Sequence, residues 1–428
     1  MKLLLKGGTV VDPGGGQSGP ADVLIENGVI SDVLSPGAGP KDADVIDVSK
    51  MTIIPGVIDI HTHLREPGFE YKETVASGTR AAAAGGVTSV ACMANTDPVN
   101  DNGQITEYIL EKAETTGVVR VYPVGAVSRG LSGEVLAEIG ELAAAGVCAL
   151  SDDGHVISNS DLMRRGMEYA VTFDLPVISH SEDMSLVADG VMNEGFVSTE
   201  LGLPANPPQA EEIMIFRDVT LAQLTGARLH VAHISTAGGV EVIRRAKERG
   251  VAVTAETCPH YFTLTDDAVR TFDTNTKVNP PLRSEEDRRA VIEGLKDGTI
   301  DVIASDHAPH DIVEKAVEFS YAASGISGLE TLLSLSLQLV RDGEMTLFDV
   351  VEKLTIAPAR TLGLAGGTLA TGVPADLTIV DTGEDWTVDP RAFFSKGKNS
   401  PFAGRSVPGR VKMTIVAGSI VYREGAIV

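Results

Sequence analysis

The chain has 428 residues, of which 43% are hydrophobic and 22% are charged, a composition typical of a large globular protein. Its formal net charge of −24 disfavours nucleic acids and anionic membranes as partners. The absence of any run of about 18 apolar residues argues against a membrane span. The three cysteines, Cys92, Cys148 and Cys258, lie far apart, which favours a reduced compartment over a disulfide framework. The N-terminal stretch is too rich in glycine for a signal peptide, so we expect a cytoplasmic protein.

The two ends of the chain share one sequence pattern. Residues 1–52 alternate short apolar runs with glycine and aspartate turns, as in ADVLIENGVISDVL (21–34), which predicts short β-strands. The same pattern recurs in residues 365–428, in ADLTIVD and GRVKMTIVAGSIVYREG. We therefore expect both termini to form one small flanking β-sheet domain, and residues 53–364 to form a separate central domain.

The central part repeats one pattern eight times. A short run rich in Val, Ile and Ala ends in polar residues, and an amphipathic stretch follows, for example at 132–145, 160–173, 236–249 and 285–297. Buried strands alternating with helices indicate a parallel sheet covered on both faces, and eight such units predict an α/β fold of the (β/α)8 barrel type. The predicted strands lie at 52–64, 87–95, 118–127, 146–154, 175–182, 228–235, 251–260 and 301–310.

The histidines concentrate where these strands end. All nine lie in or just after a predicted barrel strand, whereas a structural role would scatter them over helix surfaces. In a barrel of this type, the carboxyl ends of the strands build the active site. The nine are His61, His63, His155, His180, His230, His233, His260, His307 and His310.

The pair His61 and His63 ends the first predicted strand. Side chains alternate faces along a strand, so both rings point to the same side. A single strand histidine is more often a core residue, but two converging imidazoles favour a metal site, because burying an imidazole without a partner is costly. His180 ends the fifth strand. In the sixth strand, His230 and His233 fall on opposite faces, so we expect only one to point inward and choose His233, which lies nearer the mouth.

Carboxylates at two further strand ends complete this set. Asp306 ends the eighth strand, where it can bind a metal through one oxygen and act as a general base. Asp152 and Asp153 follow the fourth strand, and alternation allows only one of them to face inward. Four histidines and two carboxylates predict a binuclear site, for which Zn²⁺ is the best-suited ion and Mn²⁺ or Co²⁺ are alternatives.

Several motifs resemble the amidohydrolase superfamily and, within it, the class I bacterial dihydroorotases. They are GVIDIHTHLREPG (56–68), MANTDP (93–98), SDDG (151–154), VNPPLR (278–283), SDHAPH (305–310) and KNSPFAGRSVPGRV (398–411). The resemblance implies reversible hydrolysis of (S)-dihydroorotate to N-carbamoyl-L-aspartate in de novo pyrimidine biosynthesis. It also implies that a metal-activated hydroxide is the nucleophile.

The resemblance also implies roles for individual residues. His61 and His63 bind the first zinc, with Asp306 completing that site and acting as base and acid. His180 and His233 bind the second zinc. Asp153 bridges the two ions, since VCALSDDG (147–154) has no lysine to be carboxylated. The residues implied in substrate binding are His63, Arg65, Asn95, Asn279 and His310, with Ser324 and Gly325 as weaker candidates.

Arg65 is the residue that favours dihydroorotate over uncharged substrates. Dihydroorotate has a carboxylate, and a guanidinium binds a carboxylate in a planar, bidentate geometry. A neutral ring such as hydantoin or dihydrouracil leaves a desolvated arginine without a partner. The alternative interpretation of Arg65 is a surface cation that pairs with Glu66.

The sequence leaves other functions open. The segment AASGI (322–326) departs from the family's usual aromatic loop, and ETCPHYFTL (256–264) resembles allantoinases and hydantoinases. An allantoinase or a hydantoinase/dihydropyrimidinase-type cyclic amidase is therefore an alternative. A non-catalytic scaffold for aspartate transcarbamoylase is a third hypothesis, disfavoured because all six metal ligands are present. We expect a homodimer and allow for a complex with that transcarbamoylase.

Overall fold

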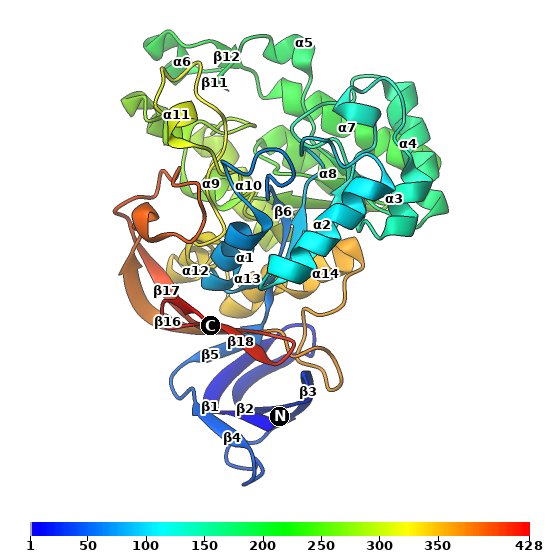
Figure 1. Ribbon diagram of the computed structural model, residues 1–428. Coiled ribbons are helices and arrows are strands. Elements are labelled where there is room, and N and C mark those ends of the chain that lie inside the picture. The colour runs from blue at the N-terminus through cyan, green and yellow to red at the C-terminus, as the bar shows by residue number, and fades with distance from the viewer. Residues whose placement is uncertain (1) are drawn as a thin grey trace.

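A computed structural model describes residues 2–428 of the chain. It contains an eight-stranded parallel sheet surrounded by helices and a separate nine-stranded sheet, which lies below the helices in Figure 1. The strands of the parallel sheet, in order, are β6 (Val57–Thr62), β7 (Val87–Cys92), β8 (Arg120–Gly125), β9 (Ala149–Ser151), β10 (Val177–Ser179), β13 (Leu229–Val231), β14 (Val253–Thr257) and β15 (Val302–Ile303).

The parallel sheet is a nearly closed barrel. Each strand pairs with the next one around the sheet, from β6 to β15. The first strand meets the segment that follows the last strand through a bridge between Thr62 and His307, and the His63 amide donates to the His307 carbonyl at 2.9 Å. The predicted (β/α)8 barrel is therefore confirmed. The strands are shorter than the predicted runs, because their last residues turn away from the sheet to form the mouth.

Helices cover the outside of the barrel and pack on its strands. The main ones are α1 (Val75–Ala84), α2 (Gly103–Thr116), α3 (Ile139–Ala145), α4 (Ser160–Thr172), α7 (Gln209–Thr225), α8 (Ala237–Glu248), α10 (Glu285–Lys296), α12 (Leu332–Arg341), α13 (Leu347–Leu354) and α14 (Ile356–Leu362). Around the mouth lie the short elements α5 (Met184–Val187), β11 (Met192–Asn193), α6 (Phe196–Leu201), β12 (Ala205–Asn206), α9 (Pro259–Thr263) and α11 (Ile312–Lys315). No helix within residues 2–428 has the length and apolar character needed to cross a membrane.

One predicted helix is shorter than expected. The pattern at 132–145 yields only α3, which begins at Ile139. The residues before it pair back onto the end of the third barrel strand, where Ala137 donates its amide to the Val127 carbonyl at 2.9 Å. Because these backbone groups are bonded elsewhere, they are not available for a helix.

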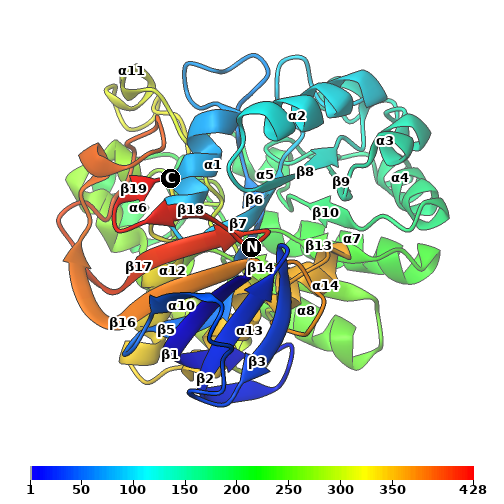
Figure 2. The same cartoon turned by 60° about the horizontal axis from the view of Figure 1, so that its bottom comes forward.

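The second sheet is built from both termini, as predicted. Its strand order is β19-β18-β17-β16-β5-β1-β2-β3, with β4 paired to β1. Figure 2 shows the N-terminal and C-terminal strands side by side in this sheet. Its strands are β1 (Lys2–Asp12), β2 (Gln17–Glu26), β3 (Val29–Leu34), β4 (Asp44–Asp47), β5 (Thr52–Pro55), β16 (Leu377–Thr387), β17 (Ser406–Val416), β18 (Ser419–Arg423) and β19 (Ala426–Ile427).

The apolar run 52–64 is two strands, and its prediction as one was wrong. β5 pairs with β1 and β16 in the flanking sheet, whereas β6 begins the barrel. Gly56 separates them, and a Cβ at this position would lie 2.1 Å from the Thr88 hydroxyl oxygen. Only glycine fits this close approach, so the chain passes directly from the flanking sheet into the barrel.

Candidate metal centre and active site

A cavity of about 470 Å³ opens at the carboxyl ends of the barrel strands. Its wall contains the predicted residues His63, Arg65, Asn95, Asp153, His180, His233, Asn279, Asp306, His310, Ser324 and Gly325. His61 lies buried at the base of the cavity and contacts two of these residues. The tertiary structure therefore brings together every site residue that the sequence predicted.

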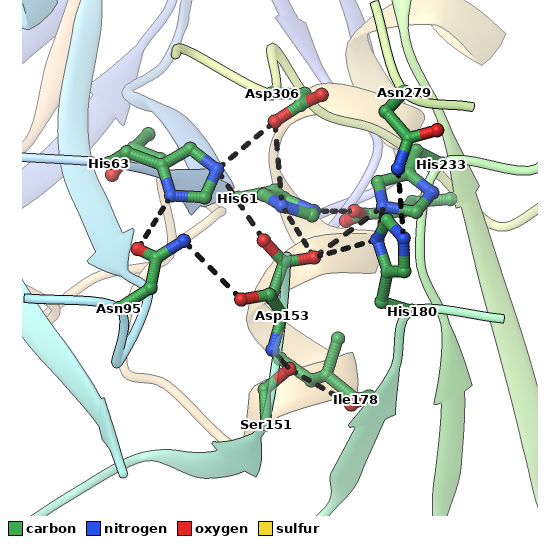
Figure 3. Close-up of polar contacts among 12 residues, drawn as sticks. His61, His63, Asn95, Ser151, Asp153, Ile178, His180, His233, Asn279 and Asp306 are labelled. Atoms are coloured by element: carbon green, nitrogen blue, oxygen red, sulfur yellow. Dashed lines mark hydrogen bonds and ion pairs between the residues drawn. The ribbon is translucent and has the colours of Figure 1, made fainter. Parts of the chain in front are cut away.

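Asp153 is the centre of this group (Figure 3). Its Oδ1 lies 3.4 Å from His61 Nε2, 3.5 Å from His180 Nδ1 and 3.4 Å from His233 Nε2. Its Oδ2 lies 3.5 Å from His63 Nε2. One carboxylate thus reaches both halves of the predicted ligand set, as a bridging ligand requires.

Asp306 lies on one side of Asp153, with the histidine pair. Its Oδ1 is 3.2 Å from His63 Nε2 and 3.5 Å from His61 Nε2. Ligand atoms of His61, His63 and Asp306 lie within 4.8 Å of one another, as do those of His61, Asp153 and His233. A third set, Cys258, His260 and Asp306, meets the same distance. However, burial raises the pKa of the Cys258 thiol well above its usual range, which disfavours a thiolate ligand.

Both histidines of the sixth strand lie inside the barrel, so the expectation that only one points inward was wrong. His230 contacts Glu256, whose other oxygen contacts His61. His233 reaches Asp153 because its backbone leaves the strand conformation, with φ of 35°. Arg65 and Asp306 also have positive φ, 61° and 47°. Such conformations are unfavourable for side chains other than glycine and concentrate at functional sites.

Hydrogen bonds on the outer nitrogens orient three of the rings. His61 Nδ1 lies 2.5 Å from Glu256 Oε1, and His63 Nδ1 lies 2.9 Å from Asn95 Oδ1. His180 Nε2 lies 3.3 Å from Glu182 Oε2. Each outer partner is an acceptor, so each outer nitrogen carries the proton and the inner nitrogen of the neutral ring presents a lone pair to the centre.

This arrangement fits a metal ion. The inner nitrogens of His61, His63 and His180 lie 3.2–3.5 Å from the carboxylate oxygens of Asp153 and Asp306, and these nitrogens and oxygens are all acceptors. The buried atoms His61 Nε2 and Asp153 Oδ1 have no hydrogen-bond partner within residues 2–428. Acceptors that face one another in a buried site need a cation between them. Imidazole and carboxylate ligands are the donor set that Zn²⁺ prefers.

The electrostatics of the centre favour positive charge. Although burial lowers the pKa of His61, the carboxylates of Asp153, Glu256 and Asp306 raise that pKa well above its ordinary value. Burial likewise raises the pKa of Asp306, but His61 and His63 hold it below its ordinary value. Asp306 is therefore held in its ionised form.

Arg65 lines the cavity, and its Nε has no hydrogen-bond partner among the described residues. This Nε is buried, and no carboxylate within residues 2–428 forms an ion pair with the Arg65 guanidinium. Glu66 instead accepts from the Val75 amide and pairs with Lys112 at 3.6 Å. The alternative interpretation, a surface Arg65–Glu66 pair, is therefore wrong. A guanidinium with a buried, unpaired Nε is suited to an anionic ligand.

The other predicted substrate residues lie around the same cavity. Asn95 and Asn279 are held by His63 and Glu182, with Asn279 Nδ2 3.0 Å from Glu182 Oε2. His310 donates from Nε2 to the Ser324 carbonyl at 2.8 Å, and burial and the nearby cations lower the pKa of His310 to about 3. Gly325 has φ of 141°, and a Cβ there would lie 2.6 Å from that of Ala308.

Sequence reasoning missed two buried glutamates in this region. Glu182 follows β10 and accepts from Asn206 and Asn279, and Glu256 lies in β14. Each stands in or at the end of a predicted barrel strand, in LPVISHSE (175–182) and VAVTAET (251–257), where burial makes an acidic residue unusual, and this signal could have marked both. Asp152 points away from the centre and accepts from the Val127 and Ser128 amides at 2.8 and 2.9 Å.

Residues 52–421 match the family model described as "Amidohydrolase family". The chain belongs to the amidohydrolase family. Among its amidohydrolase relatives, the dihydroorotase of Syntrophus aciditrophicus (strain SB) is 56% identical over 425 residues, covering 99% of this chain and 100% of the relative. The dihydroorotase of Syntrophotalea carbinolica is 56% identical over 423 residues, covering 99% of both chains.

Solved amidohydrolase structures have the same fold. An L-hydantoinase (dihydropyrimidinase) from Arthrobacter aurescens superposes with a TM-score of 0.90 at 25% identity, covering 100% of this chain and 97% of that one. A dihydropyrimidinase from Brevibacillus agri NCHU1002 gives a TM-score of 0.87 at 26% identity, covering 100% and 96%. The fold is thus shared with proteins named for other substrates, and the backbone alone does not select one.

Proposed function

We propose that this amidohydrolase is a dihydroorotase, which catalyses the reversible hydrolysis of (S)-dihydroorotate to N-carbamoyl-L-aspartate. The observation that carries the proposal is Arg65, a guanidinium with a buried, unpaired Nε in the wall of the cavity that holds the metal ligands. Hydantoin and dihydrouracil have no carboxylate for this group. The two dihydroorotases at 56% identity support the same substrate.

We further propose that the site holds zinc. His61, His63 and Asp306 would hold one ion and His180 and His233 a second, with Asp153 shared between them. Zinc, when bound in such a site, lowers the pKa of water toward neutrality and polarises a carbonyl oxygen.

The side chains of this protein then divide the remaining work. Arg65 binds the substrate carboxylate through paired charge-assisted hydrogen bonds. Asn95, Asn279 and His310, with Ser324 and Gly325, form the polar wall around the ring. Asp306, which is ionised, accepts the proton of the attacking water and returns it to the ring nitrogen as the carbon–nitrogen bond breaks. In the reverse direction the same carboxylate removes the proton from that nitrogen.

The test is a substrate panel on zinc-loaded protein, with metal content measured on the same sample. L-dihydroorotate, dihydrouracil, hydantoin and allantoin are compared. We expect turnover of dihydroorotate alone, lost on chelation and restored by zinc. Turnover of hydantoin or allantoin in its place would overturn the substrate assignment while leaving the metal site intact. Metal binding without turnover of any of the four would favour the scaffold hypothesis, to be tested by adding an aspartate transcarbamoylase.

We also propose that the enzyme is cytoplasmic and forms a homodimer. Analytical ultracentrifugation of the zinc-loaded protein, alone and with a transcarbamoylase, measures both the oligomeric state and the complex.

A further inference from the structure

A series of hydrogen-bonded side chains leads from His61, at the candidate metal centre, to Glu256, His230 and Thr254. Glu256 lies in β14 and is about 1% exposed, between two imidazoles that are fully buried, His61 and His230. Its Oε1 is 2.5 Å from His61 Nδ1, and its Oε2 is 3.1 Å from His230 Nε2. His230 Nδ1 is 2.8 Å from the Thr254 hydroxyl oxygen. We propose that Glu256 and His230 are positioning residues that hold His61 with its Nε2 lone pair directed at the metal centre.

The direction of every hydrogen bond in this chain follows from its carboxylate. Ionised Glu256 only accepts, so His61 Nδ1 and His230 Nε2 both carry protons. Neutral His230 then has a lone pair on Nδ1, which accepts from the Thr254 hydroxyl. With its proton on Nδ1, His61 can offer only Nε2 to the centre. Glu256 therefore selects the ring tautomer that is able to bind a metal.

The backbone of His61 is held independently of its ring. Asp59 Oδ1 accepts from the His61 amide at 3.2 Å and from the Ser305 amide at 3.1 Å. This contact ties the first barrel strand to the last one beside Asp306. Loss of Glu256 would therefore release the ring of His61 while its Cα stayed in place, so the effect on metal binding is separable from unfolding.

No lysine or arginine pairs with Glu256 within residues 2–428; its side-chain partners are the two histidines. A buried carboxylate is costly unless its oxygens are hydrogen-bonded, and here both are. If only barrel packing were required, an apolar residue would serve. The carboxylate is explained by what it does to His61. This inference rests on the proposed zinc site, but not on the identity of the substrate.

The first test replaces Glu256 by glutamine. The amide keeps one acceptor for His61 and must present its NH2 group to His230 Nε2. His230 can adapt by moving its proton to Nδ1 and donating to Thr254. We expect Glu256→Gln to retain the metal-binding tautomer of His61 but to lose the charge, and to weaken zinc binding about 10- to 100-fold. Zinc affinity is measured by chelator competition on the apo protein, without substrate.

Thr254→Val provides the decisive comparison. Alone, it leaves the His230 tautomer unchanged, so zinc affinity should stay within about twofold of wild type. Combined with Glu256→Gln, it removes the acceptor that His230 needs for its other tautomer. The amide then turns its NH2 group to His61, whose Nε2 becomes protonated. We expect the double variant to lose at least about tenfold more zinc affinity than the product of the single effects, because one buried donor has no partner when zinc is bound.

Asp218→Asn is the matched control. Asp218 is a fully buried carboxylate on α7, outside the barrel, and it accepts from Ser179 and Arg217. The same chemical change there should alter thermal stability but not zinc affinity. Wild-type zinc affinity in Glu256→Gln, or additive effects in the double variant, would overturn the proposal.

A measurement on the unaltered zinc-loaded protein covers the case in which Glu256→Gln does not fold. ¹⁵N-histidine NMR should show His61 protonated at Nδ1, and an Nδ1 without a proton would refute the inference. Zinc binding and dihydroorotate turnover are separate readouts. If the protein binds zinc as described but does not hydrolyse dihydroorotate, this inference stands and only the proposed substrate is wrong. If the zinc-loaded enzyme is active but the effects of Glu256→Gln and Thr254→Val on zinc affinity are additive, only this inference is wrong.

Discussion

Arg65→Met tests the choice of substrate most directly. Methionine keeps much of the length of the side chain and removes its charge. Because no ion pair of Arg65 is present in residues 2–428, the substitution breaks no internal ion pair and leaves no carboxylate unpaired. We therefore expect the melting temperature to stay the same or rise, so that a change in kinetics reports on the substrate and not on folding.

The magnitude follows from the pairing of a guanidinium whose Nε is buried with a substrate carboxylate in the cavity. Removing one partner of a buried, hydrogen-bonded charge pair costs about 2–5 kcal/mol, which corresponds to a loss of about 30- to 5,000-fold. We expect kcat/KM for dihydroorotate to fall within this range. Dihydrouracil lacks the carboxylate, so any slow turnover of dihydrouracil should be unchanged or faster in Arg65→Met.

The assay compares both substrates on wild-type protein, Arg65→Met and a control, Lys112→Met. Lys112 is a half-exposed cation that pairs with Glu66 beside the same loop but does not line the cavity. The control measures the effect of losing one positive charge near the site, and we expect it to change kcat/KM less than twofold. Equal losses on the two substrates in Arg65→Met, or a loss in Lys112→Met as large as that in Arg65→Met, would refute direct carboxylate binding.

Three further substitutions are informative. Asp306→Asn should lower kcat by about 10²–10⁴-fold through loss of proton transfer, with most of the zinc retained in metal analysis; near-normal turnover of the metal-loaded variant would remove Asp306 from the mechanism. The buried Asn399 side chain accepts from the His310 amide at 3.0 Å and donates to the Gly325 carbonyl at 2.9 Å, so Asn399→Ala should raise KM about tenfold. An unchanged KM would show that these contacts do not shape the substrate wall. Burial raises the pKa of Glu330 to about 8, so the folded protein holds a proton that the unfolded chain releases. The free energy of unfolding that this protonated group contributes is therefore lost as the pH rises through about 8. Glu330→Gln should therefore raise the melting temperature relative to wild type at pH 9 and have little effect at pH 5, and a pH-independent difference would contradict the shift.

The barrel could be predicted from local pattern alone. Each of its strands is an apolar run ending in polar residues, and that pattern is a property of neighbours in the chain. The placement of His61, Asp153, His180 and Asp306 at strand ends followed from the same runs. Carboxyl ends of parallel strands meet at one mouth, so strand-end residues converge without any further information.

What alternation of side chains could not predict was the local departure from strand geometry. His233 faces the centre because its φ is positive, which period-two alternation does not anticipate. Alternation placed His230 and His233 on opposite faces, and the prediction that His230 points outward was therefore wrong. The split of the run 52–64 at Gly56 depends on the close approach of Thr88, a residue 32 positions further along the chain. Such departures arise from the contacts that they make possible, which a local pattern does not record.

The sequence by itself determined the fold class, the ends of the strands and the residue types that gather at the mouth. Only the tertiary structure decided which groups pair there. His61 and Glu256 are 195 residues apart and lie 2.5 Å apart, and Arg65 lacks the partner that its neighbour Glu66 suggested. Periodicity reports which face a side chain occupies, but hydrogen-bond partners across a barrel depend on the register between distant strands, and that register is set only when the barrel closes.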